Sequence, residues 1–309
     1  MKEGFVISVD GGLGDHVCAE PAVRYLIEKV YPDRDVHIVC GVPRIFAHLS
    51  VPLHLHNTYD PEKELGYPKR FTFPTTGSLR ESLCFLTTHM VDYHAAALLL
   101  RTLPLRDKEI RLAVFPEDRQ ELREQLRGVD PKTLIVVHAG KSWQTKTFPR
   151  VWWEAVVGGL VERGMPVCLV GKRDSDSGTG VIDVAVPPGV LDLRDALSLG
   201  ALLALLHDAS LLISNDTSLI QMAGAFNNSI MLIASCKHPD FVLPYRNGSP
   251  YHKARALYKR LLVDELPFEP LRDGVLRVDV PVADWGMYLP DPEVVVEEAI
   301  LLSRKNEYT

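Results

Sequence analysis

The chain has 309 residues, 46% of them hydrophobic and 24% charged, so it can bury one large core or two medium ones. Its formal net charge of −6 gives no electrostatic argument for nucleic-acid binding, although a local basic groove stays compatible with it. No apolar run is long enough to span a membrane and the first residues read as a strand, so we expect neither a transmembrane segment nor a signal peptide.

The cysteines are odd in number and widely scattered, which excludes a disulfide framework that uses all of them and any closely spaced metal knuckle. They are Cys18, Cys40, Cys84, Cys168 and Cys236. Buried free thiols in a reducing cytoplasm are the favoured interpretation. His89 and His94 also lack the i, i+4 spacing of a zinc-binding helix, so no metal site is expected.

The first half begins like an α/β nucleotide-binding domain. A short apolar strand at 4–9 runs into a glycine-rich turn. A helix is expected over 19–29, with Pro21 in its first turn, and a second strand over 36–40. This order is typical of such a domain, because glycines let the backbone turn sharply and approach a ligand closely.

The glycine turn, GGLGD, is neither a dinucleotide fingerprint nor a P-loop. The pattern GxGxxG would need a glycine where Val17 stands, and no Gly-Lys-Ser/Thr follows, which disfavours an NAD-dependent enzyme. The notable feature of the turn is a carboxylate, Asp15, at the entrance of a helix, with His16 beside it. Asp15 fits either a helix cap or a general base, and His16 fits an ordinary surface residue.

The rest of the first half is less regular. A segment rich in proline and glycine at 59–88, which includes Lys69 and Arg70, is predicted to be a functional loop. The elements expected around and after it are a helix at 81–101, a strand at 110–114, a charged helix at 116–127 and a linker at 128–132.

The second half repeats the alternation of strands and helices. Strands are expected at 134–138, 167–170, 190–193, 211–213 and 229–234, and helices at 150–163, 198–208 and after 217. The loops that follow the strands carry Ser142, Lys146, Lys172 and Asp216. Lysine and hydroxyl groups at the carboxyl ends of parallel strands suit a diphosphate, whereas a lone loop lysine is normally just solvated.

The stretch 211–226, LLISNDTSLIQMAGAF, joins a buried strand, a polar turn and an apolar helix. This arrangement places a ligand at the carboxyl end of a strand, where the backbone N–H groups of a helix start attract anions. Asn215, Asp216 and Thr217 fit either such a site or a simple helix cap.

Together these segments resemble glycosyltransferase family 9, the ADP-heptose:lipopolysaccharide heptosyltransferases and their relatives. The family's glycine-aspartate turn after the first strand is matched by Gly14-Asp15. Its His-Pro-Gly and Lys-x-Trp-Pro motifs are matched by 138–140 and 146–149, and its Asn-Asp-Thr-Gly-x-x-His-x-Ala-Ala run by 215–225. The resemblance covers nearly the whole chain and is strongest over 134–233.

The resemblance implies a GT-B fold, an α/β architecture of two Rossmann-like domains with parallel sheets facing a central cleft. The acceptor-side domain would span 1–130 and the nucleotide-sugar domain 131–290, and a C-terminal helix in 291–309 would pack back on the first domain. The implied activity is metal-independent transfer of a sugar from a nucleotide-sugar of the ADP-heptose type to a hydroxyl of lipopolysaccharide core or a related glycan. The nucleotide-sugar is a substrate, so no cofactor is expected.

By the same resemblance, Asp15 would be the general base that takes the proton of the acceptor hydroxyl. The residues implied in donor binding are Gly14, Gly140, Ser142, Lys146, Gly171, Lys172, Asp216, Thr217, Ser218 and Gln221. His16, Lys69 and Arg70 are candidates for acceptor binding. Gln221 stands where the family usually has His, and Ser218 where it usually has Gly; both departures bear on the identity of the sugar and nucleotide.

Two alternatives stay open. A phage-type glycosyltransferase that acts on hydroxymethylated bases of DNA would need only a different acceptor groove. Candidates for that groove are Lys69, Arg70, Arg101 and Arg106. The other alternative is an inactive nucleotide-sugar-binding protein, with Gln221 as a mark of decay, but the retained Asp15, Lys146 and Asp216 favour an enzyme. A cytoplasmic location is expected, and peripheral attachment at the inner membrane face is compatible with it.

Overall fold

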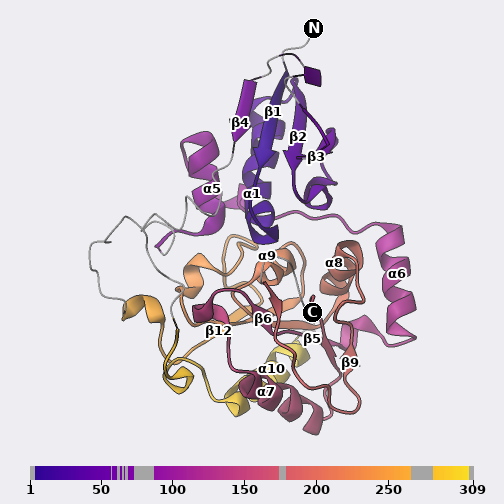
Figure 1. The fold of residues 1–309 in the computed structure, drawn as a ribbon, viewed down its shortest axis with the longest axis vertical. Helices are drawn as coiled ribbons and strands as arrows, with labels where there is room; N and C mark the ends of the chain where they lie inside the picture. Colours follow the sequence, from indigo (N-terminus) through magenta and orange to yellow (C-terminus); the bar gives the residue numbers. More distant parts are fainter. Residues whose placement is uncertain are drawn as a thin grey trace.

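The computed structural model describes residues 4–56, 58–60, 63–64, 66, 69–72, 87–173, 179–265 and 281–305. The chain forms two parallel β-sheets, one above the other, flanked by helices (Figure 1). This confirms the predicted two-part α/β architecture. Cys84 and the first part of the helix expected at 81–101 lie outside the described residues. No helix within the described ranges is long and apolar enough to cross a membrane.

The upper sheet in Figure 1 has the strand order β3-β2-β1-β4, with all strands parallel. Its strands are β1 (Gly4–Val9), β2 (Asp35–Cys40), β3 (Leu53–Leu55) and β4 (Lys69–Thr72). Helices α1 (Leu13–Tyr25) and α5 (Met90–Leu99) pack against each other beside this sheet, and a π-helix (Leu26–Val30) continues α1.

The lower sheet has the order β12-β11-β10-β5-β7-β9, again all parallel. Its strands are β5 (Ile135–His138), β7 (Val167–Leu169), β9 (Leu191–Asp192), β10 (Leu211–Asn215), β11 (Ser229–Ile233) and β12 (Ala254–Leu257). The helices around it are α6 (Pro116–Leu126), α7 (Arg150–Glu162), α8 (Leu199–Asp208), α9 (Ser218–Ala223) and α10 (Pro292–Lys305). A short antiparallel pair, β6 (Gly140–Lys141) with β8 (Gly180–Val181), follows the end of β5.

Short 3-10 helices occupy several of the connections. They are Pro43–Phe46, Leu105–Asp107, Pro131–Thr133, Gln144–Lys146, Pro239–Phe241, Leu262–Asp264 and Trp285–Met287. The expected linker at 128–132 therefore runs into one of these turns, just before β5. The turn at Gln144–Lys146 carries the lysine that the sequence singles out.

The strands of the lower sheet are apolar on both faces because helices cover each face. Along β5, Val136 faces a core shared with α1, α8 and α9, whereas Ile135 and Val137 face a core formed with α7 and α10. The first of these cores continues into the upper sheet, where it includes Phe5 and Ile38. One packed core therefore joins the two sheets.

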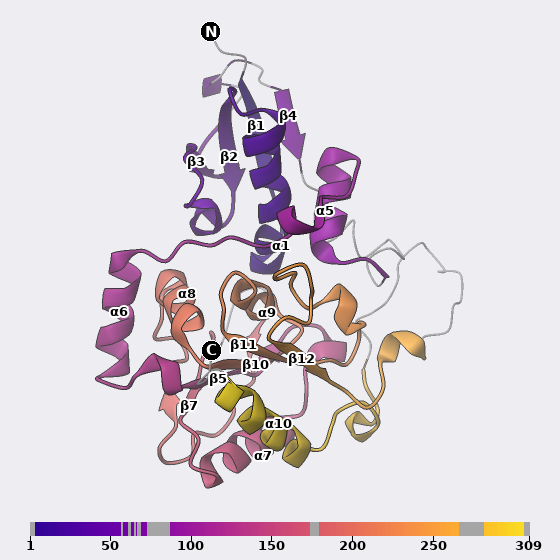
Figure 2. The same cartoon turned by 180° about the vertical axis from the view of Figure 1, so that it is seen from behind.

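Helix α10 lies under the lower sheet beside α7, on the side away from the upper sheet (Figure 2). Its residues Val295, Val296 and Ala299 are buried in the core on that face. A Cβ atom on Gly159 of α7 would lie only 2.9 Å from Val296 Cγ2, so a glycine allows the two helices to pack closely. The expectation that a helix in 291–309 packs back on the first domain is therefore wrong, because the apolar face of α10 completes the lower core.

The chain passes from one sheet to the other before α6, since α6 packs against α8 of the lower sheet. This places the spatial boundary ahead of α6 rather than at 130. The strand predicted at 110–114 is instead an extended crossing segment, visible between α5 and α6 in Figure 2. Side chains of the upper domain hold it: Arg111 N donates to Glu20 Oε2 at 2.9 Å, and Arg44 Nη2 donates to Ala113 O at 3.0 Å.

Helix α1 begins at Leu13 rather than at Ala19, so Pro21 lies inside it and not in its first turn. Proline has no N–H, so the carbonyl of Val17 loses its usual helical partner, a cost that the burial of α1 offsets. The early start has a functional consequence, because it places Asp15 in the first turn of a helix that points at the lower sheet (Figure 1).

Candidate active site

A cavity of about 730 Å³ lies between the two sheets, where the end of β1 faces the ends of β5, β7, β10 and β11. In the lower sheet the chain runs from β5 outward in one direction to β7 and in the other to β10 and β11. The carboxyl ends of parallel strands at such a reversal are the usual ligand site of an open α/β sheet. The fold therefore brings together, at this one cavity, the loops that the sequence analysis identified as candidates for ligand binding.

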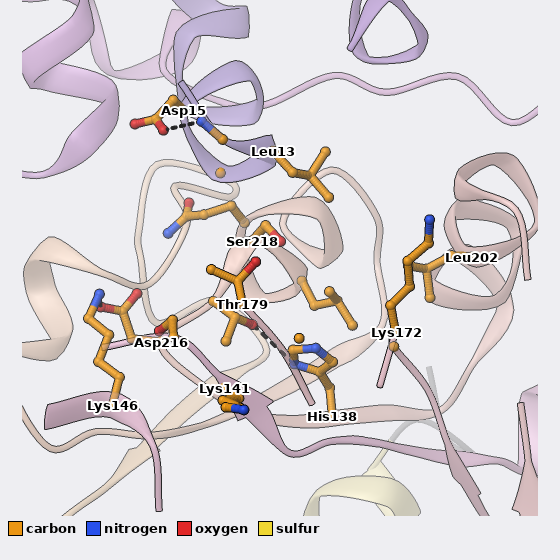
Figure 3. Close-up of a pocket in the computed structure, with 18 of the residues that line it drawn as sticks. Leu13, Asp15, His138, Lys141, Lys146, Lys172, Thr179, Leu202, Asp216 and Ser218 are labelled. Carbon is orange, nitrogen blue, oxygen red and sulfur yellow. Dashed lines mark hydrogen bonds and ion pairs between the residues drawn. The ribbon is translucent and has the colours of Figure 1, made fainter. Parts of the chain in front are cut away.

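Asp15 enters this cavity from the upper domain (Figure 3). The backbone N–H of Gly12 donates to its Oδ2 at 2.8 Å, which fixes the carboxylate in the first turn of α1. The preceding Gly11 has φ +99°, and a Cβ at that position would lie 2.6 Å from Asp15 Oδ2. A glycine is thus required for the turn and for the space that the carboxylate occupies.

His16 does not line the cavity. It is fully buried, its Nδ1 lies 2.8 Å from Gly12 O, and its Nε2 lies 3.1 Å from the backbone nitrogen of Gly41. The carbonyl can only accept and the amide can only donate, so the ring is neutral and carries its proton on Nδ1. Burial lowers the pKa of His16 and favours this neutral form. A direct contact with an acceptor is not supported.

Lys69 and Arg70 do not line the cavity either. Both are exposed residues on β4, an edge strand of the upper sheet. They therefore do not join Asp15. Among the described residues, the upper domain instead contributes the N-terminal end of α1 and neighbours such as Leu13, Val42 and Met90 to the cavity wall.

Lys146 and Asp216 form an ion pair in the cavity, with Nζ 2.5 Å from Oδ2 (Figure 3). The Lys146 ammonium also lies 4.4 Å from the centre of the Trp143 ring, a cation–π contact. Both charged side chains are largely shielded from solvent, at 12% and 22% exposure. The sequence-predicted pair of donor-binding residues is thus brought together.

Asn215, at the end of β10, holds the loop that carries Lys146. Its side chain is fully buried, accepts from Gly140 N at 2.9 Å and donates to Gly140 O at 2.9 Å. It also donates to the carbonyl of Lys146. A Cβ on Gly140 would lie 2.7 Å from the Asn215 oxygen and 2.4 Å from Thr217 Cγ2, so Gly140 packs closely against both side chains. Gly140 is not itself one of the residues that line the cavity.

His138 lies on the cavity wall at the end of β5. Its Nδ1 lies 3.0 Å from Ser214 Oγ and 3.3 Å from Thr217 Oγ1. Burial lowers its pKa to about 4, so the ring is neutral at physiological pH. Gly171, at φ +118°, leaves room for this ring, because a Cβ there would lie 3.0 Å from His138 Cδ2.

The remaining predicted donor residues also line the cavity: Gly14, Ser142, Gly171, Lys172, Thr217, Ser218 and Gln221. Ser218 is the first residue of α9 and is not among the residues with positive φ, so this turn does not need the family's glycine. Gln221 is buried and donates to Val242 O, while its Oε1 has no hydrogen-bond partner among the described residues. The structure thus holds a buried acceptor beside the cavity with no partner among the described residues.

Sequence reasoning missed three features of the cavity. An apolar wall comes from the end of β9 and the start of α8: Leu193, Leu197, Leu199 and Leu202. Lys141 lies at an exposed edge, and Lys237 is buried in the loop after β11. The position of Lys237 in the loop after a parallel strand, β11, is a signal of the same kind as those that identify Lys146 and Lys172.

The described lining has an excess of positive charge. It contains four lysines, Lys141, Lys146, Lys172 and Lys237. Its described carboxylates are Asp15 and Asp216, so lysines outnumber carboxylates by two in this lining, in a protein whose formal net charge is −6. A partly enclosed site with this balance favours an anionic ligand.

Two parallel α/β sheets whose carboxyl ends face one such cleft define a GT-B protein. The sequence model described as glycosyltransferase family 9 (heptosyltransferase) matches residues 83–248, more than half of the chain, and the chain belongs to this family. Members of such a family transfer a sugar from a nucleotide-sugar. No curated protein matches the chain significantly.

Solved structures support the same fold. A family 9 glycosyltransferase from Veillonella parvula DSM 2008 has a TM-score of 0.68 at 15% identity, covering 99% of this chain and 98% of that one. ADP-heptose lipopolysaccharide heptosyltransferase II of E. coli has a TM-score of 0.67 at 15% identity, covering 98% and 99%. The dodecameric iron-containing heptosyltransferase TibC, solved with ADP-D-β-D-heptose, has a TM-score of 0.59 at 15% identity, covering 84% of this chain and 63% of that one.

Proposed function

We propose that this glycosyltransferase moves a sugar from a nucleotide-diphosphate-sugar of the ADP-heptose type to a hydroxyl of a lipopolysaccharide-core or related glycan. The observation that carries the proposal is that Asp15 and the Lys146–Asp216 pair line one cavity from opposite domains. A base and a cationic leaving-group site on opposite walls suit displacement at an anomeric carbon held between them.

Asp15 is the proposed general base. Its carboxylate is held in place by the N–H of Gly12, so it reaches the cavity in one orientation. An alcohol is a weak nucleophile until a base takes its proton, and a positioned carboxylate can do so as the carbon–oxygen bond forms. The proton then resides on Asp15 until the product leaves.

The lysines of the cavity are proposed to bind the diphosphate, which carries the negative charge that develops when the sugar leaves. We also propose that transfer needs no metal ion, because these ammonium groups supply the positive charge. The matching test is activity after treatment with a chelator: retention of the rate supports the proposal, and loss that is restored by one added metal contradicts it.

The apolar wall of Leu193, Leu197, Leu199 and Leu202 is proposed to receive the nucleobase, because a flat, weakly hydrated ring gains most from such a surface. The Oε1 of Gln221, which has no partner among the described residues, is proposed to accept from a sugar hydroxyl. A glycan acceptor is preferred over DNA, since Lys69 and Arg70, two of the cations considered for a DNA groove, lie away from the cavity. The proposed location is the cytoplasm, which the buried free thiols of the described cysteines favour.

The deciding experiment combines donor binding with an Asp15→Asn variant. ADP-, UDP- and GDP-sugars are compared by thermal stabilisation, and the best donor is then assayed with lipopolysaccharide-core oligosaccharides. Asn keeps the bond from Gly12 N–H but cannot take a proton, so turnover should fall by about 10²- to 10⁴-fold while donor affinity stays unchanged. Asp10→Asn, which changes a carboxylate just outside the cavity, is the control.

Two results would contradict the proposal. If no nucleotide-sugar stabilises the folded protein, the donor site is absent. If Asp15→Asn keeps turnover within a fewfold of the wild type, Asp15 is not the base. Donor binding without any turnover in the wild type would instead favour a nucleotide-sugar-binding protein.

A further inference from the structure

His138 has one ring nitrogen that the protein itself does not use. The residue lies at the end of β5, is 7% exposed and lines the cavity. Its Nδ1 has two hydroxyl neighbours, Ser214 Oγ at 3.0 Å and Thr217 Oγ1 at 3.3 Å. Its Nε2 makes no hydrogen bond to any residue that the structure describes. Packing and the bonds at Nδ1 account for the burial of the ring, but they leave Nε2 unexplained.

The groups around Nδ1 show which nitrogen carries the ring proton. Ser214 Oγ has a single proton, which it donates to the backbone carbonyl of His138 at 3.1 Å. Toward Nδ1 the same oxygen can then only accept, so the proton of the neutral ring belongs on Nδ1. Thr217 Oγ1, 3.1 Å from Ser214 Oγ, can donate to that oxygen as well. Nε2 therefore holds a lone pair and is a hydrogen-bond acceptor.

Two glycines leave the Nε2 edge of the ring uncovered. A Cβ on Gly171 would lie 3.2 Å from His138 Nε2, and a Cβ on Gly140 would lie 2.9 Å from His138 Cε1. Gly171 also lines the cavity, so the space that its missing side chain leaves beside Nε2 belongs to the cavity wall. A ligand group in the cavity can thus approach this nitrogen.

The strand order places His138 in the middle of the site. In the lower sheet β5 lies between β7 and β9 on one side and β10 and β11 on the other. The apolar wall begins at the end of β9, whereas Asp216, paired with Lys146, follows β10. Figure 3 shows the same order, with His138 between the Lys146–Asp216 pair and Leu202. A ligand that contacts both the apolar wall and Lys146 must therefore cross the end of β5.

In a nucleoside diphosphate the group between the base and the diphosphate is the ribose, whose 2′- and 3′-hydroxyls can donate hydrogen bonds. We propose that Nε2 of His138 accepts a hydrogen bond from a ribose hydroxyl of the donor nucleotide, so that the site selects ribonucleotides over deoxyribonucleotides. This rests on the proposed function, because it assumes a nucleotide-sugar in the cavity. It adds a ribose subsite between the base and the diphosphate, and it gives a role to the nitrogen that the protein leaves unbound.

Isothermal titration calorimetry of the wild type with ADP, 2′-deoxy-ADP and 3′-deoxy-ADP tests the contact without any substitution. Removing the bound hydroxyl leaves Nε2 without a partner, so one of the two analogues should bind about five- to thirtyfold more weakly than ADP. The analogue that loses affinity identifies the hydroxyl. Equal affinity for ADP and both analogues would overturn the inference.

Three variants connect this preference to His138. His138→Phe keeps a ring but has no acceptor, so it should bind ADP and the sensitive analogue equally, at about the affinity that the wild type has for the analogue. His138→Gln carries an amide oxygen that can reach the position of Nε2, and it should recover part of the preference. His207→Phe, at a half-exposed position near the far end of α8, is the matched control and should keep the wild-type preference.

The outcomes separate this inference from the proposed function. If His138→Phe still prefers ADP as strongly as the wild type does, another residue binds the hydroxyl and the role of His138 is overturned. If His138→Phe weakens ADP and both analogues equally, the residue acts through the shape of the site, which also overturns it. If the wild type binds all three nucleotides equally, only this inference fails. If the wild type binds none of them, the proposed function fails with it.

Discussion

Asp15 and His16 are neighbours in sequence, but their side chains point in different directions in the structure. Asp15 faces the cavity, whereas the imidazole of His16 turns inward and joins Gly12 O to Gly41 N. The same Gly12 residue holds the Asp15 carboxylate through its N–H. His16 therefore ties the turn that orients the proposed base to the backbone at the end of β2, and we infer that it is a positioning residue.

Replacing His16 by Leu should lower kcat about tenfold or more and leave ADP affinity within twofold, because the turn loosens while the lower domain is untouched. His16→Asn, whose amide N–H can replace Nδ1–H toward Gly12 O, should recover part of the rate. The measurements are kcat, KM and nucleotide titration on both variants. An equal fall in kcat and nucleotide affinity, or no fall in either, would contradict the positioning role.

At the scale of single elements, the site depends on how three loops of the lower sheet are tied together. The side chain of Asn215 at the end of β10 bonds to the β5 loop at Gly140 and to the carbonyl of Lys146. Ser235, after β11, adds a bond from its Oγ to Thr145 O at 2.7 Å. The lysine loop is thus held from two neighbouring strands, which keeps Lys146 beside Asp216.

Asn215→Ala should lower the free energy of unfolding by about 2–4 kcal/mol, because it leaves buried backbone groups of Gly140 and Lys146 without partners. Nucleotide affinity should fall as well, since Lys146 loses its support. Urea unfolding and ADP titration measure the two effects. Asn227→Ala, at an exposed position in the next turn, should stay within about 0.5 kcal/mol of the wild type. Normal nucleotide binding by Asn215→Ala would argue against this support.

For the whole molecule, the contact between the domains contains a buried histidine. His89 Nε2 lies 2.9 Å from Leu243 O, and Tyr245 OH donates to Asp92 Oδ2 at 2.9 Å, so the start of α5 is fastened to the loop that follows Pro239–Phe241. Burial lowers the pKa of His89 to about 4. The same holds for His138 and for His94, whose pKa values are also about 4.

These histidines are expected to make the protein less stable in acid. Well above pH 6.5, the usual pKa of histidine, they are neutral in both the folded and unfolded states and add no pH dependence. Between about pH 6.5 and 4 the unfolded chain binds their protons and the folded chain does not, so stability should fall as pH falls. Each contributes a slope of up to about 1.4 kcal/mol per pH unit.

Urea unfolding at pH 7, 6, 5 and 4.5 measures this slope. His89→Gln keeps an N–H donor for Leu243 O but does not titrate. The free energy of unfolding of this variant should therefore fall less steeply with decreasing pH than that of the wild type, by the contribution of one histidine. His238→Gln, at a half-exposed position, is the matched control for the substitution itself. A slope that is identical in the wild type and His89→Gln would contradict the assignment.

The sequence by itself determined the order of five of the six strands of the lower sheet, the loops that carry Ser142, Lys146, Lys172 and Asp216, and the family, whereas β12 was not predicted. The strands are visible in the sequence as continuous apolar runs that end at Gly, Ser or Asp. These local signals are easy to recognise because each strand is buried on both faces and is therefore apolar throughout. The position of Asp15 also followed from local pattern, although the start of α1 did not, because Pro21 resembles a first-turn proline until the helix packs around it.

Only the tertiary structure decided the contacts between distant segments. The docking of α10 under the lower sheet, the crossing segment at 110–114 and the burial of His16 depend on which surfaces meet. Lys237 belongs to the same group, since its burial results from the upper domain closing over the β11 loop at Thr88. Local patterns report the intrinsic preference of a segment, whereas these features arise from packing and charge between segments far apart in the chain.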